Sequence, residues 1–156
     1  MYDKILVPHA GTPAGDKALK HAIHIAQSSS SQIILLHVIE DFPHVPVFFL
    51  HVSQVSKIKR ELAQVTKDMK VVMEKEMIKR VETCTKNKIK SHFKVVTGLP
   101  AEEILKIVKN QKIDLIVMAK RRKLKGIKRI MSISSVSRKI LEHISCPVLI
   151  IEIEKK

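Results

Sequence analysis

The sequence has 156 residues, of which 45% are hydrophobic and 28% charged, and its formal net charge is +14. This length and apolar content allow a globular core without disulfide or metal support, and they exclude a disordered chain. No apolar run approaches the roughly 18 residues of a membrane span, and the first residues lack the regions of a signal peptide. We therefore expect a single cytoplasmic domain over residues 1–156, with no membrane partner.

The first half of the chain predicts two strands and two helices. Residues 5–8 and 33–39 are continuous apolar runs, which are typical of strands buried in a parallel sheet. Between them, apolar residues recur at helical spacing over residues 14–27. A loop at residues 40–53 holds Phe42, Phe48 and Phe49, and a long helix follows it to about residue 87.

The second half predicts three more strands and two more helices. The strands are expected at residues 92–96, 114–118 and 147–151, and the helices at residues 101–110 and 135–143. Strands thus alternate with helices along the whole chain. That order predicts an α/β fold, a doubly wound five-stranded parallel sheet with right-handed crossovers and helices on both faces.

Five segments, in the same order, resemble parts of the universal stress protein family. They are YDKILVP at residues 2–8, LHV at residues 36–38, GLPAEEI at residues 98–104, DLIVM at residues 114–118, and the final helix and strand at residues 135–150. The resemblance covers essentially the whole chain.

The resemblance implies a Rossmann-like sheet with strand order 3-2-1-4-5, as in domains of the adenine nucleotide alpha hydrolase type. It also implies a stress-response role and a homodimer paired through the last strand, residues 147–153. Many family members bind ATP or AMP at the carboxyl ends of strands one and four, where open parallel sheets bind ligands. ATP hydrolysis is weak or absent in many of them, and we identify no catalytic residue and no metal ligand in this chain.

The turn after the first strand departs from the family pattern. Nucleotide-binding relatives carry an aspartate there to hold adenosine, and Ala10 takes that position here. His9 either replaces part of the lost hydrogen-bond acceptor or serves as a structural hydrogen bonder at the strand end.

The loop after the fourth strand departs further. The family's three phosphate-binding glycines align here with Ala119, Arg122 and Ser134. Ser135 and Ser137 remain to cap the next helix and offer hydroxyls to an anion. Lysine and arginine crowd residues 120–129, so the loop either binds a phosphate with side chains or is a solvated basic loop without a fixed ligand.

The predicted ligand is therefore ATP, AMP or another small anion, bound weakly or not at all. Its candidate binding residues are Pro8, His9, Ala10, Val38, Met118, Ala119, Arg121, Arg122, Ser134, Ser135, Val136 and Ser137.

Two other functions stay open. The first is protein interaction without a nucleotide, through the long helix and the loop at residues 42–52. The second is nucleic-acid binding through residues 120–129, which the absence of aromatic side chains in that stretch disfavours.

Overall fold

The computed structural model describes residues 1–40, 51–120 and 135–152. Nine elements lie within these residues, and their bounds lie within two residues of the predicted ones. In chain order they are β1 (Lys4–Pro8), α1 (Pro13–Ser29), β2 (Gln32–Glu40), α2 (Val52–Lys86), β3 (Ser91–Gly98), α3 (Pro100–Gln111), β4 (Leu115–Lys120), α4 (Ser135–His143) and β5 (Val148–Glu152).

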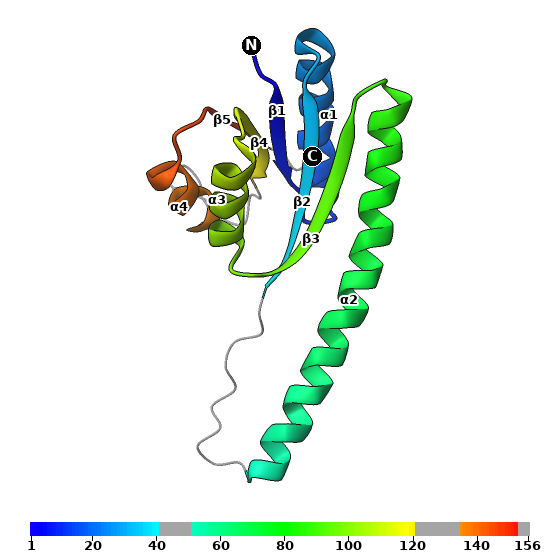
Figure 1. The fold of residues 1–156 in the computed structure, drawn as a ribbon, viewed down its shortest axis with the longest axis vertical. Coiled ribbons are helices and arrows are strands. Elements are labelled where there is room, and N and C mark those ends of the chain that lie inside the picture. Colours follow the sequence, from blue (N-terminus) through cyan, green and yellow to red (C-terminus); the bar gives the residue numbers. More distant parts are fainter. Residues whose placement is uncertain (41–50, 121–134, 153–156) are drawn as a thin grey trace, which may run out of the picture.

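The five strands form one parallel sheet in the order β3-β2-β1-β4-β5, which confirms the predicted fold (Figure 1). The central strand β1 pairs with β2 on one side, with Pro8 opposite Leu36. On its other side it pairs with β4, with Leu6 opposite Ile116. The strand order therefore reverses between β1 and β4.

Helices cover both faces of this sheet, because its strands are apolar on both sides. One buried cluster joins the sheet to α1 and α2, and includes Leu19, Leu35 and Met77. The other joins it to α3 and α4, and includes Leu36 and Ile140. Successive residues of β2 alternate between the two clusters, as the pleat of a strand requires.

Local sequence explains how α1 starts directly behind β1. Thr12 caps the helix, its hydroxyl accepting a hydrogen bond from the Gly15 N–H at 3.4 Å. Pro13 occupies the first turn, where a missing N–H costs nothing, and Asp16 adds a favourable negative charge there.

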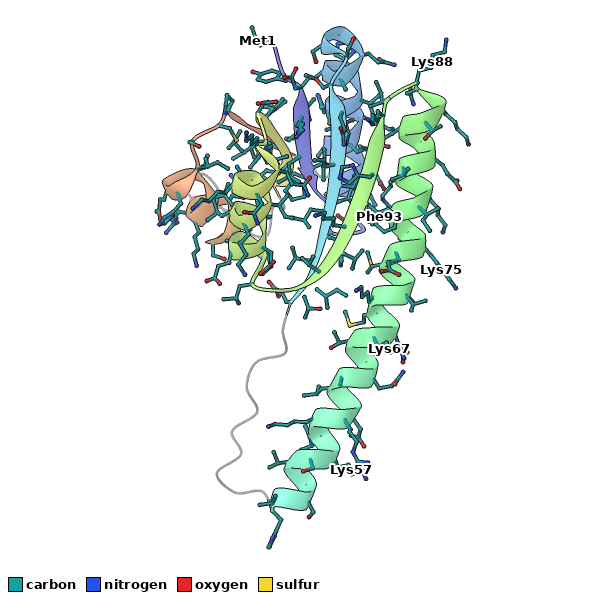
Figure 2. All side chains as sticks on the ribbon, in the orientation of Figure 1. Met1, Lys57, Lys67, Lys75, Lys88 and Phe93 are labelled. Carbon is teal, nitrogen blue, oxygen red and sulfur yellow. The ribbon has the colours of Figure 1, made fainter. Side chains whose placement is uncertain are left out.

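Helix α2 is much longer than the sheet it covers. Figure 1 shows it running beside β3 and continuing well beyond the ends of the strands. Lys57, Lys67 and Lys75 lie along its outer side (Figure 2). Val65 and Val72 are exposed on the same helix. This is the long helix that the alternative function, protein interaction without a nucleotide, would use.

Strand β5 is an edge of the sheet and pairs only with β4 among the described strands. The Ile116 N–H donates to the Pro147 carbonyl, so by alternation the backbone groups of Val148 and Ile150 face away from β4. None of the described helices is long and apolar enough to cross a membrane.

Candidate functional site

A cavity of about 750 Å³ lies at the carboxyl ends of β1, β2 and β4, next to the first turns of α1 and α4. Its volume is within the range of small-molecule sites. The lining residues are Pro8, His9, Ala10, Thr12, Ala14, Gly15, Leu36, His37, Val38, Ile39, Glu40, Met69, Pro100, Ile104, Met118, Ala119, Ser135, Val136 and Ser137. A smaller hollow of about 310 Å³ lies between α2 and β3. Phe93, which is labelled in Figure 2, is one of its lining residues.

The cavity lies where the strand order reverses. The connection after β1 runs to β2, and β4 lies on the opposite side of β1. The loops on the two sides diverge there and leave a crevice, which is the usual ligand site of doubly wound sheets.

Nine of the twelve predicted binding residues line this cavity. They are Pro8, His9, Ala10, Val38, Met118, Ala119, Ser135, Val136 and Ser137. The other three, Arg121, Arg122 and Ser134, lie outside the described residues, as do the basic loop beyond Lys120 and most of the loop at residues 42–52.

Sequence reasoning missed several lining residues. His37 and Glu40 lie at the carboxyl end of β2 beside Val38, so that strand's end was a usable signal for both. Met69 reaches the cavity from α2. The helical spacing of Met69 with its apolar neighbours indicates a core position, and no neighbouring residue in the sequence indicates that Met69 lines a cavity.

The imidazole of His9 is fully buried, and both its ring nitrogens have protein partners. Nδ1 accepts the Gly11 N–H at 3.0 Å, and Nε2 lies 3.1 Å from Oδ1 of Asp16. The ring is therefore neutral with its proton on Nε2, which donates to Asp16. Arg80 Nε, 3.1 Å from Nε2, donates to the same carboxylate oxygen at 2.8 Å. His9 thus acts as a structural hydrogen bonder, the second of the two roles predicted for it.

The surroundings of His9 disfavour its protonated form. Burial is the largest cause and the nearby Arg80 guanidinium the second, and together they lower the pKa of His9 to about 4. Asp16 opposes this shift with its charge and its hydrogen bond. Arg80 also pairs with Glu76 at 2.9 Å, so the cluster ties the turn between β1 and α1 to α2.

Two glycines allow this close packing. A Cβ on Gly15 would lie 2.7–2.8 Å from three atoms of the His9 ring. Gly11 has a φ of +71°, in the left-handed region that favours glycine. A Cβ on Gly11 would also lie 2.7 Å from Cε of Met73 on α2.

The other end of the cavity is formed by the first turn of α4. Ser135 is exposed there, and Ser137 is 1% exposed and lines the cavity wall. The unpaired N–H groups and the dipole of a helix N-terminus attract anions. Among the described residues, no three His, Cys, Asp or Glu side chains are grouped closely enough to hold a metal ion.

Comparison with known proteins places the whole chain in one family. The model of the universal stress protein family matches residues 1–152. A universal stress protein of Methanocaldococcus jannaschii, MJ0531, is 29% identical over 158 aligned positions, covering 100% of this chain and 85% of its own.

Two solved structures share the fold. That of MJ0577, from the same organism, has a TM-score of 0.79 at 22% identity and covers 100% of this chain and 99% of its own. A universal stress protein family protein from Arabidopsis thaliana with AMP bound has a TM-score of 0.60 at 21% identity, covering 96% and 91%. The family match over residues 1–152 shows that the chain belongs to the universal stress protein family.

Proposed function

We propose that the protein is a stress-response binding module whose cavity holds a nucleotide such as AMP or ATP, with the phosphate at the first turn of α4. The cavity at the reversal of strand order is the single observation that carries the proposal. The AMP bound to the Arabidopsis relative supports it.

Charge and geometry favour an anion at α4. The helix has nine residues, with Ser135 at its first position and Ser137 within its first turn. Backbone N–H groups and the hydroxyl of the exposed Ser135 at this end are the donors that a phosphate needs. The net charge of +14 adds a long-range attraction for anions.

The binding is expected to be weaker than in relatives with a complete motif. Ala10 lines the cavity but offers no side-chain acceptor. Ala119 also lines it, at the position of a family glycine, and its methyl group keeps the backbone further from a phosphate than glycine does. We therefore expect saturation only well above micromolar nucleotide.

Calorimetric titration with AMP, ATP and inorganic phosphate tests the proposal. In Ser135→Asp, a carboxylate stands where the phosphate would bind, while an acidic residue remains favourable in the first turn of the helix. We expect about 10- to 100-fold weaker nucleotide binding, since a charge-assisted contact is worth about 1.5–3 kcal/mol.

Ser53→Asp is the matched control, because Ser53 is an exposed residue in the first turn of α2, a helix end remote from the cavity (Figure 1). It should bind like the unaltered protein. Equal affinities of the two variants would refute the phosphate position. Absence of binding by the unaltered protein at millimolar AMP and ATP would refute the proposed function.

A further inference from the structure

We propose that His37 recognises the nucleoside end of the ligand. Its Nε2 accepts a hydrogen bond from a hydroxyl or amino group of a nucleoside phosphate bound in the cavity. This inference rests on the proposed function and adds to it a residue that selects nucleoside phosphates over inorganic phosphate.

The hydrogen bonding of His37 determines which nitrogen carries the proton. Nδ1 lies 2.7 Å from the backbone carbonyl oxygen of His9. A carbonyl oxygen only accepts hydrogen bonds, so Nδ1 carries the hydrogen and donates it. In the neutral ring, Nε2 is then an unprotonated acceptor.

Nε2 of His37 is an acceptor without a described protein partner, on a residue that lines the cavity. His37 is 9% exposed and lines the cavity. Within the part of the chain that the structure describes, Nε2 has no hydrogen-bond partner. Among the described residues, the fully buried side-chain polar atom without a partner is Ser91 Oγ, so Nε2 of His37 is accessible from the cavity. A ligand that covers Nε2 without supplying a donor would leave it unpaired, which is costly, so a ligand that brings a donor is favoured. The neighbouring ring of His9 has no such capacity, because both its nitrogens are engaged.

The position of His37 in β2 shows which class of ligand fits. The strand's alternation puts His37 on the same face as Leu35 and Ile39, which is the face covered by α1 and α2. Helix α4, with Ser135, belongs to the opposite face. A ligand that contacts both must cross the carboxyl edge of the sheet. Inorganic phosphate is too small to do so, whereas a nucleoside phosphate carries its phosphate at one end and its hydroxyl and amino donors at the other.

The test uses the full chain and AMP as the probe. In His37→Asn, the side-chain amide can still donate to the His9 carbonyl, but no atom takes the place of Nε2. We expect this variant to bind AMP about five- to tenfold more weakly, the value of one neutral hydrogen bond, with unchanged affinity for inorganic phosphate. His24→Asn, on the exposed side of α1, should bind AMP like the unaltered protein.

Ligand analogues identify the donor. One of 2′-deoxy-AMP, 3′-deoxy-AMP and inosine monophosphate should lack the group that donates to His37. The unaltered protein should bind that analogue about five- to tenfold more weakly than AMP, and His37→Asn should bind the analogue and AMP equally well. If the unaltered protein binds AMP and His37→Asn binds it equally well, the role of His37 is wrong while the proposed function stands. If the unaltered protein does not bind AMP, both are wrong.

A second measurement keeps the proposal testable if His37→Asn does not fold. Nitrogen-15 spectra of histidine-labelled, unaltered protein should show an unprotonated Nε2 on His37. That resonance should shift upfield when AMP saturates the cavity, because a hydrogen bond to an unprotonated ring nitrogen shields it. A protonated Nε2, or a resonance that stays in place at saturation, would overturn the proposal.

Discussion

The buried ring of His9 makes the stability of this protein depend on pH between about 4 and 6.5. In the unfolded chain, His9 binds a proton near its ordinary pKa of 6.5, whereas in the folded protein its pKa is about 4. Between these values the unfolded state holds more protons, so the free energy of unfolding falls as the pH falls. The contribution of His9 is therefore fully present above pH 6.5 and is lost as the pH approaches 4.

The size of the loss follows from the shift in pKa. A difference of one pKa unit corresponds to 1.36 kcal/mol, so the lowering of the His9 pKa from 6.5 to about 4 amounts to about 3 kcal/mol in total. Full burial of the side chain justifies the conversion, because solvent does not screen the ring. A loss of this size is a large part of the stability of an ordinary domain.

Urea unfolding followed by far-ultraviolet circular dichroism, at steps from pH 7 to pH 4, measures this loss. In His9→Asn, the amide oxygen can still accept the Gly11 N–H, but the side chain does not titrate. Its free energy of unfolding should therefore fall by about 3 kcal/mol less than that of the unaltered protein over this range.

Carboxylates that do not contact His9 contribute equally to both proteins and cancel in the difference. His24→Asn removes an exposed histidine from α1 and is measured alongside as the control for the loss of a histidine. A His9→Asn curve that runs parallel to that of the unaltered protein would refute the reasoning, since it would mean that His9 protonates equally in the folded and unfolded states.

Three further predictions concern packing, ligand binding and assembly. Gly15→Ala puts a methyl group against the buried His9 ring and should lower the free energy of unfolding by about 1–3 kcal/mol in urea titrations; an unchanged midpoint would contradict this. Ala10→Asp restores an acceptor at the cavity wall and should tighten AMP binding in calorimetry, and equal or weaker binding would argue against a nucleoside there. Because β5 is the edge strand of the sheet formed by the described strands, we expect a homodimer by light scattering. Leu149→Lys should convert it to a monomer and Ile78→Lys on α2 should not; a monomeric unaltered protein would exclude this interface.

The fold could be predicted from the sequence because its signals are local. Continuous apolar runs such as residues 33–39 indicate strands buried on both faces, and helical spacing indicates the helices between them. The order of the strands in the sheet came from the family resemblance, since no local pattern states which strands are neighbours. Residues at strand ends, such as Pro8, Val38 and Met118, could be assigned to the cavity because a doubly wound sheet binds ligands at those ends.

The roles of individual side chains in the cavity were decided only by the tertiary structure. From sequence, His9 had two possible roles. Its partner Arg80 is 71 positions away, and that contact, together with burial, makes the ring a neutral structural group. His37 resembled any residue of a buried strand until its bond to the His9 carbonyl showed which nitrogen remains free. Protonation and hydrogen-bonding capacity depend on burial and on charges brought close by folding, and neither is encoded in the neighbouring residues of the chain.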